Sequence, residues 1–304
     1  MTQTPASAQE HALLRLFRWI GGRSLTSLRR FGRFMGNVLY LSGRGPARVT
    51  RINIGLCFPE LTDAQQRALT RASLQETAIT GLEVAWAWTQ PVETVLGQIR
   101  EVDGDVTPDE NGLIVLAPHL GNWEVLGLWL GQTQAQMASL YAPPNQPWLE
   151  PFMRQARERS GATLHPTDRR GVLQLSRCLK AGGTVGILPD QEPDFGSGEF
   201  APFFGIPANT MTLAVKLAQK TGARVLAVAA LRCPGDDGFR IIARSVDESI
   251  YAPDLSQALR AMNRAVEALV REAPAQYQWE YKRFKRRPDN RLPHVYDNRR
   301  RPHG

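Results

Sequence analysis

The feature that most constrains this fold is a repeated alternation of short apolar runs with segments of helical periodicity. Apolar runs of strand length occupy residues 113–117, 138–141, 184–188 and 224–231. Helical patterns separate them, one from residue 122 and others at residues 147–159, 171–180 and 210–220. Because parallel strands need a crossover connection, usually a helix, this alternation is typical of an α/β sheet. The sequence therefore predicts an α/β fold with a central, mostly parallel or mixed sheet and helices on both faces.

Further elements flank this alternating core. A helical pattern from residue 62 to about residue 88 begins at Thr62 or Asp63, both good capping residues, and Pro91 closes it. Residues 239–246 are expected to add an edge strand, and the apolar stripe between residues 255 and 270 predicts a long helix. We assign residues 46–288 to a single domain.

Two basic amphipathic patterns lie before this domain, within residues 1–45. In residues 13–20 and 25–41 apolar side chains recur every three or four positions, while arginines gather on another face. Such a stripe can simply pack on the core, but arginine as the only charge beside it favours helices that lie in a membrane interface. No run reaches the ~18 apolar residues of a membrane span. Arginines also interrupt what would be a signal peptide, so we expect no export.

Positive charge is concentrated at the two ends of the 304-residue chain. Residues 1–52 hold nine arginines and one glutamate, and residues 282–304 hold nine lysines or arginines and two aspartates. Basic ends attract an anionic partner, either nucleic acid or the phosphate-bearing surface of a membrane. We expect residues 289–304 to form a basic, mobile tail. Three cysteines without a CxxC pair and five dispersed histidines indicate no disulfide framework and no metal site.

The strongest candidate for chemistry is the segment PHLGNWE at residues 118–124. It follows a buried strand, and Gly121 and Asn122 have the character of a turn and cap that open the next helix. The segment therefore lies at the carboxyl edge of the sheet, where open α/β sheets bind ligands. On one continuous helix His119 and Glu124 would point about 140° apart, but a loop before Glu124 lets its carboxylate reach back to the imidazole.

A carboxylate on one ring nitrogen orients an imidazole and makes the other nitrogen a better base. We therefore predict His119 and Glu124 as a catalytic base and its partner. The alternative is a histidine that only packs near a helix end, and a five-residue spacing alone does not separate the two readings.

The same segment resembles the H-x-x-x-x-D/E motif of glycerolipid and lipid A acyltransferases. Three further blocks resemble those of the late lipid A acyltransferases, the lauroyl and myristoyl transferases: RVTRINIGLCFPE at residues 48–60, LPDQEPDFGSGEFAPFFGIPANT at 188–210 and QYQWEYKRFKRRP at 276–288. The resemblance covers roughly residues 28–288, in order. Glycerol-phosphate acyltransferases often carry Asp at the position of Glu124 and a Gly-Thr-Arg block at residues 189–191, so both departures favour the lipid A branch.

The resemblance implies a direct transfer without a covalent enzyme intermediate. His119 would remove a proton from a lipid hydroxyl, which attacks an acyl thioester, while Glu124 steadies the imidazolium. Asn122 is assigned to substrate binding, and the backbone N–H groups near Gly121 and Asn122 are candidates for stabilising the oxyanion.

Three other positions receive substrate-binding roles from the same resemblance. Arg154 is implied to bind a phosphate of the lipid or of a carrier's phosphopantetheine, with Arg157 and Arg159 as alternatives on the same helix. Asp190 and Gln191 follow a strand just as His119 does, and are implied to line the acceptor pocket. The aromatic pair at residues 203–204 is a candidate border of an acyl groove.

The implied donor is acyl-acyl carrier protein, and the implied acceptor is an anionic lipid, a lipid A precursor, at the cytoplasmic face of a Gram-negative inner membrane. Basic ends suit both the acidic carrier and the phosphorylated lipid. We expect no metal and no cofactor. A second reading is acylation of another lysolipid, such as lysophosphatidate or an aminoacyl lipid, from acyl-CoA or acyl carrier protein.

A third reading is nucleic-acid binding, because aromatic and basic residues alternate between residues 277 and 286. The same alternation fits an edge strand that leads into a membrane-facing basic tail, and no RNA-binding signature accompanies it. We therefore expect no nucleic-acid partner.

Overall fold

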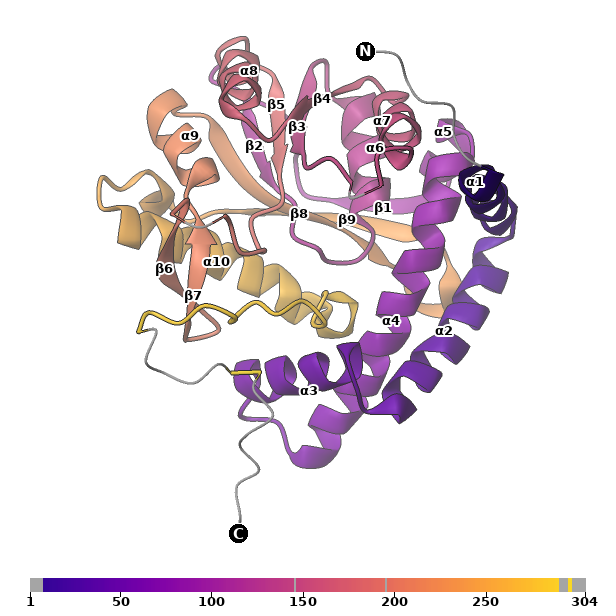
Figure 1. Cartoon of the computed structure of the whole chain (residues 1–304). Coiled ribbons are helices and arrows are strands. Elements are labelled where there is room, and N and C mark those ends of the chain that lie inside the picture. Colours follow the sequence, from indigo (N-terminus) through magenta and orange to yellow (C-terminus); the bar gives the residue numbers. More distant parts are fainter. Residues whose placement is uncertain (1–7, 145, 195, 290–294, 297–304) are drawn as a thin grey trace.

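A seven-stranded sheet forms the centre of the protein (Figure 1). The structure is a computed structural model and describes residues 8–144, 146–194, 196–289 and 295–296. The strand order is β1-β9-β8-β2-β5-β3-β4, and neighbouring strands are parallel except for β8 and β9. These strands are β1 (Ile99–Asp103), β2 (Leu113–Leu116), β3 (Met137–Tyr141), β4 (Ala162–Pro166), β5 (Thr184–Ile187), β8 (Arg224–Arg232) and β9 (Phe239–Ser245). The predicted α/β fold with a mostly parallel, mixed sheet is confirmed.

Helices cover both faces of this sheet and extend it on one side. They are α1 (Ala8–Gly21), α2 (Leu25–Ser42), α3 (Pro46–Cys57), α4 (Asp63–Thr89), α5 (Val92–Leu96), α6 (Trp123–Thr133), α7 (Leu149–Glu158), α8 (Arg169–Lys180), α9 (Leu213–Thr221) and α10 (Leu255–Glu272). Strand residues alternate between two hydrophobic cores. Leu113 and Val115 of β2 face the core that includes α6, whereas Ile114 and Leu116 face the core that includes α8, α9 and α10. A separate antiparallel hairpin joins β6 (Gly198–Phe203) to β7 (Ile206–Met211).

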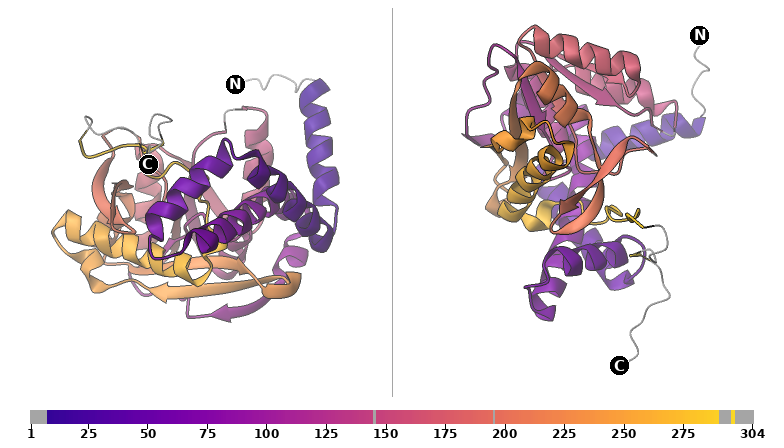
Figure 2. Two further views of the ribbon diagram at one scale, coloured as in Figure 1. Left: turned by 90° about the horizontal axis from the view of Figure 1, so that it is seen from below. Right: turned by 90° about the vertical axis from the view of Figure 1, so that its left-hand side faces the viewer.

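The long helix α4 connects the N-terminal helices to the sheet and lies between α2 and the strands (Figures 1 and 2). Its N-cap is Thr62, one of the two residues predicted for that position. The Thr62 hydroxyl accepts from the Gln65 N–H, and the Gln65 side chain accepts from the Thr62 N–H. Two glycines of α2 allow close approach to α4. A Cβ at Gly36 would lie 2.3 Å from Gln75 Cα, and one at Gly32 would lie 2.8 Å from Ile79 Cα.

A buried ion network fastens the same helices to the sheet. Arg29 of α2 donates to Glu83 of α4 at 2.7 Å, and Arg232 at the end of β8 donates to the other oxygen of Glu83 at 2.9 Å. All three side chains are buried. A buried carboxylate is tolerated only when its charge is paired, and two guanidiniums satisfy that need here. Part of the arginine face of residues 25–41 is therefore used inside the fold.

The apolar stripes of the first two helices are divided between the core and the surface. Leu25 and Leu28 of α2 are buried. The exposed large apolar side chains of α1 and α2 are Leu13, Leu16, Trp19, Phe31, Phe34, Met35, Val38 and Leu41. None of the helices in the described part of the chain has both the length and the apolar character needed to cross a membrane.

Several sequence predictions need correction. Residues 99–103, 162–166 and 198–203 are strands that the sequence did not indicate, and the predicted helix at residues 210–220 begins only after β7. Residues 239–245 form the expected strand, but β1 lies outside it, so it is not an edge, and no strand forms between residues 277 and 286, where an edge strand was one interpretation of the alternation. Most of the predicted mobile tail lies outside the described residues. Within it, Tyr296 is buried and donates to Asn53 Oδ1 at 2.6 Å.

Candidate active site

His119 and Asp190 meet at the carboxyl edge of the sheet. His119 follows β2 and Asp190 follows β5, and these strands are parallel neighbours, so their ends lie side by side. The backbone N–H of His119 donates to Asp190 Oδ2 at 2.9 Å, and His119 Nδ1 lies 2.9 Å from Asp190 Oδ1. An ionised carboxylate only accepts hydrogen bonds, so Nδ1 carries the proton, and in the neutral ring Nε2 keeps its lone pair. The arrangement is that of a base held by a carboxylate.

Asp190 stays charged in this buried position. Burial by itself would raise the pKa of Asp190, but attraction to the His119 ring and the hydrogen bonds from that ring and its backbone outweigh burial and hold that pKa below its usual value. Tyr277 lies beside the carboxylate. Burial first, and then the charge of Asp190, hold the pKa of Tyr277 well above its usual 10.0. Its hydroxyl therefore remains a neutral neighbour of the Asp190 charge.

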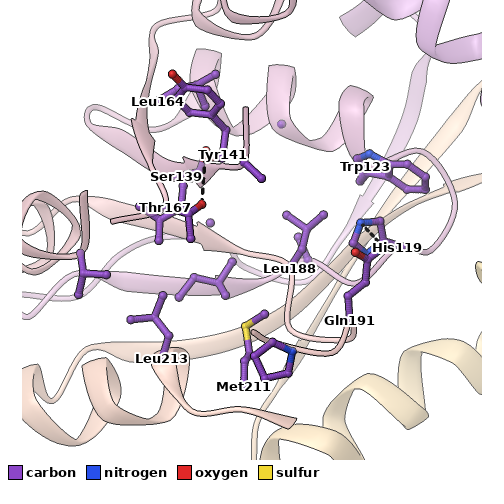
Figure 3. A pocket seen from close by; sticks show the side chains of 18 of the residues that line it. His119, Trp123, Ser139, Tyr141, Leu164, Thr167, Leu188, Gln191, Met211 and Leu213 are labelled. Carbon is purple, nitrogen blue, oxygen red and sulfur yellow. Dashed lines mark hydrogen bonds between the residues drawn. The ribbon is translucent and has the colours of Figure 1, made fainter. Parts of the chain in front are cut away.

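Gln191 occupies the open side of the imidazole (Figure 3). Its Nε2 lies 3.2 Å from His119 Nε2 and 3.2 Å from Gln278 Oε1. Because Nε2 of His119 has a lone pair, the Gln191 amide is the donor in this contact. A substrate hydroxyl that bound at the same place would also donate to this nitrogen. The prediction that Gln191 lines the pocket agrees with its position in the cavity wall.

The Glu124 carboxylate binds other groups than His119, its predicted partner. Its carboxylate accepts from Arg157 Nε at 2.9 Å, from Arg157 Nη2 at 2.5 Å and from Trp88 Nε1 at 2.8 Å. Within the described chain, its hydrogen-bonding partners do not include His119. The physical reason is the start of α6, where Asn122 Oδ1 accepts from the N–H groups of Glu124 and Val125. This cap turns Glu124 toward α4 and α7, while His119 turns toward the loop after β5.

Electrostatics explain why Glu124 is stable in this position. Burial would raise the pKa of Glu124, but the charge of Arg157 and hydrogen bonds from Arg157, Trp88 and Trp123 overcome that penalty and lower it. Arg157 also lies with its guanidinium carbon 5.5 Å from the centre of the Trp88 ring. Glu124 and Arg157 thus form a fixed ion pair, and both line the same cavity as His119.

Of the three arginines proposed for phosphate binding, only Arg157 lines this cavity. Arg154 donates to Glu158 at 3.1 Å one turn along α7, and its guanidinium lies over Tyr141. Arg159 donates to the backbone carbonyls of residues 87 and 156. The preference for Arg154 over Arg157 is therefore not supported by the geometry, because contacts with Glu158 and Tyr141 hold the Arg154 side chain out of the cavity wall.

Three other expected roles do not fit the geometry. Asn122 is fully buried, caps α6 and donates to Glu83 Oε2 at 3.0 Å, so it has no surface for substrate. The backbone N–H of Gly121 donates to the carbonyl of Gln276, and that of Asn122 donates to the carbonyl of Ala230. Neither N–H is available for an oxyanion. The aromatic pair at residues 203–204 packs against Phe58 and Trp279 rather than lining the cavity.

The cavity beside His119 has a volume of about 980 Å³ and two distinct parts. At its mouth, over the carboxyl ends of the strands, polar and charged side chains gather, among them Gln191, the basic Arg169 and Lys216, and the acidic Asp168 and Asp194. An apolar arm continues between α6 and the sheet. Its wall consists of Gly127, Leu130, Met137, Ser139, Tyr141, Ala162, Leu164 and Gly186. Figure 3 shows Ser139, Tyr141 and Leu164 at the side of the pocket away from His119 and Trp123.

Sequence reasoning missed some of the residues that shape this site. Trp88 of α4 bonds Glu124, the Trp123 ring meets the His119 ring edge to face at 4.9 Å, and Gln278 supports Gln191. Trp123 stood inside the motif and could have been suspected. Trp88 and Gln278 carried no local signal, because they reach the site only through folding of distant segments.

The chain is similar to known proteins along most of its length. A profile described as "Bacterial lipid A biosynthesis acyltransferase" matches residues 12–286. The chain is 26% identical over 266 residues to the "Lipid A biosynthesis lauroyltransferase" of Escherichia coli (strain K12), with 86% of each chain covered. It is 29% identical over 247 residues to the "Lipid A biosynthesis palmitoleoyltransferase" of the same organism, with 79% of each chain covered. The "Lipid A biosynthesis myristoyltransferase" of that organism is 26% identical over 270 residues, with 86% of this chain and 80% of the relative covered.

Proposed function

The chain belongs to the bacterial lipid A biosynthesis acyltransferase family, and we propose that it transfers a fatty acyl chain. The donor in this proposal is an acyl carrier protein, and the acceptor is a hydroxyl of a lipid A precursor. The observation that carries the proposal is the His119–Asp190 pair at the mouth of a cavity with an apolar arm. A base beside an apolar cleft suits the activation of a hydroxyl next to a long hydrocarbon chain.

In the proposed reaction His119 Nε2 accepts the proton of the lipid hydroxyl. The hydroxyl oxygen forms a bond to the thioester carbonyl carbon, and the carbonyl oxygen becomes an oxyanion. When this intermediate collapses, the carbon–sulfur bond breaks and the imidazolium returns its proton to the departing sulfur. The products are an ester and a free thiol, and no acyl-enzyme forms. Asp190 stabilises the imidazolium, the role that sequence reasoning gave to Glu124.

Three basic side chains of the cavity wall can pair with the phosphates of donor and acceptor, among a larger number of carboxylates in the same wall. Arg157 lines the wall, and Arg169 and Lys216 lie at the mouth. Guanidinium and ammonium groups bind phosphate well, so we assign the phosphates of the lipid and of the carrier's phosphopantetheine to this region, with Arg157 in the place of Arg154. Glu124 holds the Arg157 guanidinium in one orientation.

The exposed apolar side chains of α1 and α2 support an enzyme that acts on a membrane surface. Trp19, Phe34 and Leu41 are 59%, 60% and 80% exposed. Large apolar side chains beside arginines are typical of helices that lie in the interface of an anionic bilayer. We propose the cytoplasmic face of the inner membrane as the site of action, with both helices lying on it.

The test offers the purified protein two donors, acyl-acyl carrier protein and acyl-CoA, and two acceptors, a lipid A precursor and a lysophosphatidate. Mass spectrometry of the products should show an added acyl chain on the lipid A precursor with the carrier-protein donor. Acylation of lysophosphatidate alone would contradict the proposed acceptor, and use of acyl-CoA alone would contradict the proposed donor. His119→Ala serves as the inactive control.

A further inference from the structure

The apolar arm of the cavity ends at a distinct floor. From Tyr141 to Met137 the strand β3 runs four residues away from the carboxyl edge, a depth of about 13 Å at ~3.3 Å per residue. Along the opposite wall, Trp123 to Leu130 of α6 spans about 10 Å. The two walls give similar depths, close to half of the ~30 Å hydrocarbon core of a bilayer, which is the depth of one layer of acyl chains.

The arm exists because small side chains lie next to one another under α6. In the sheet, Ser139 of β3 pairs with Gly186 of β5, and Met137 pairs with Ala162 of β4. Residues paired in this way lie on the same face of a sheet. Ser139 and Gly186 have little or no side chain to fill the gap below α6, so the space above them remains open, whereas Ala162 lies close to Gly131 of α6.

Met137 and Gly186 meet at the inner end of this space. A Cβ built on Gly186 would lie 2.7 Å from Met137 Cε, which is closer than two carbon atoms tolerate. The methyl group of Met137 therefore fills the position that a side chain at residue 186 would need. Gly186 is not among the glycines with positive φ, so its backbone does not require glycine. The missing side chain at this position makes room for Met137 and for whatever enters the arm.

We propose that Met137 and Gly186 set the length of the acyl chain that the enzyme transfers. Met137 forms a floor made of a flexible thioether, and Gly186 leaves the space beside it open. A chain that ends before Met137 leaves a void, and a chain that runs beyond it must displace a buried side chain, 6% exposed in this structure. The inference rests on the proposed acyl transfer, because it concerns the acyl chain of the donor, which this wall would contact.

Two substitutions move the floor in opposite directions. Met137→Ala deepens the arm and should favour longer chains, whereas Gly186→Ala pushes the Met137 methyl group into the arm and should favour shorter ones. One methylene in an apolar pocket changes selectivity by about tenfold or more. Each variant should therefore shift the ratio of longer to shorter products by at least about tenfold.

Met153→Ala is the matched control. Met153 of α7 is as buried as Met137, at 5% exposure, and packs in the same core without lining the cavity. It therefore reproduces the loss of a buried methionine without moving the floor. A second control, Gly81→Ala on α4, adds a methyl group where no atom lies within 4 Å.

The experiment gives each protein an equimolar mixture of acyl carrier proteins loaded with saturated chains of increasing length, together with a lipid A precursor, and reads products by mass spectrometry. Opposite shifts for Met137→Ala and Gly186→Ala, with unchanged ratios for both controls, would support the proposal. Identical ratios in all five proteins, the wild type included, would overturn it while leaving the acyl transfer intact.

Direct binding provides a readout that does not depend on turnover. Free fatty acids of the same lengths are titrated into each protein, and the longest chain that binds tightly is determined by displacement of a fluorescent fatty acid. The limit should move up in Met137→Ala and down in Gly186→Ala. A wild type that transfers no chain but shows these limits would contradict the proposed function alone, and limits that do not move would contradict the role of the floor.

Discussion

Two buried carboxylates lie close to one cavity, Glu124 in its wall and Asp190 behind His119 rather than in the wall, and they have different hydrogen-bonding partners. Glu124, five positions from His119, accepts from Arg157 and Trp88, whereas Asp190, 71 positions from His119, accepts from both the ring and the backbone of that residue. The carboxylate that binds His119 is therefore not the one closest to it in sequence. The order of parallel strands decides this partner, because β2 and β5 place His119 and Asp190 at adjacent strand ends.

The largest expected effect follows from removing the base itself. His119→Ala should lower kcat by about three orders of magnitude, since a general base contributes ~10²–10⁴-fold. The measurement is product formation by mass spectrometry under saturating donor and acceptor. Turnover near that of the wild type would remove His119 from the chemistry and with it the comparison of the two carboxylates.

Exchanging each carboxylate for its amide separates their roles. Asp190→Asn should lower kcat by about 10²–10⁴-fold, because the amide no longer fixes the tautomer of His119 or stabilises its charged form. Glu124→Gln should instead lower the free energy of unfolding by about 3 kcal/mol, because it leaves the partly buried Arg157 unpaired. Steady-state kinetics and urea unfolding of both variants give the two numbers. A larger kcat loss in Glu124→Gln than in Asp190→Asn would reverse the assignment.

The arginines of α7 provide a smaller contrast. Arg157→Gln should raise KM for the acyl carrier protein donor by about tenfold, the value of one charge-assisted contact to phosphate. Arg154→Gln, whose parent residue pairs with Glu158 outside the cavity, should stay within about twofold of the wild type. A larger rise in KM for Arg154→Gln than for Arg157→Gln would instead support Arg154 as the phosphate-binding residue.

The apolar surface of α1 and α2 can be compared with apolar residues elsewhere. The double variant Phe34→Ser/Leu41→Ser should bind anionic vesicles about tenfold more weakly, because each side chain is only partly removed from water in the interface and so contributes a fraction of the ~1.5–3 kcal/mol of full burial. The matched control is Phe200→Ser/Leu173→Ser, which alters two side chains exposed by 38% and 49% on β6 and α8. Equal losses in a vesicle sedimentation assay would mean that α1 and α2 have no special role.

The smallest expected effect concerns acid stability. The pKa of Glu124 is lowered from its usual 4.5 in the folded protein, so the stability that its ionised form contributes is fully present above that value and is lost as pH falls through the folded pKa. Replacing the pair by Glu124→Leu/Arg157→Leu should therefore make the fall of unfolding free energy below about pH 5 shallower. Urea unfolding at several pH values measures the slope, and a slope equal to that of the wild type would count against a charged Glu124.

Much of the fold could be predicted because its signals are local. The apolar runs of β2, β5 and β8 and the helical stripe of α10 report burial through periodicity alone. The strands β1 and β4 could not be predicted in this way, because they lie at the two edges of the sheet and are only partly buried. Their sequences have too few apolar residues to stand out from loops.

The site was predicted in part for the same reason. His119 and Gln191 were placed at the correct edge, because a residue that follows a parallel strand must lie there. The partner of His119 depended on which strand neighbours β2, and strand order has no local signal. The alternation of aromatic and basic residues after position 276 was equally ambiguous. Tyr277, Trp279 and Phe284 are buried, which leaves no aromatic surface of theirs for stacking on bases.

The central claim is that Asp190, and not Glu124, holds the proton on Nδ1 of His119. Proton–nitrogen NMR of the histidine rings tests it most directly, with His119→Gln identifying the resonances among those of the five histidines. We predict a protonated Nδ1 and a bare Nε2 in the wild type and in Glu124→Gln, and a shifted or mixed ring form in Asp190→Asn. A ring unaffected by Asp190→Asn but altered by Glu124→Gln would contradict the account.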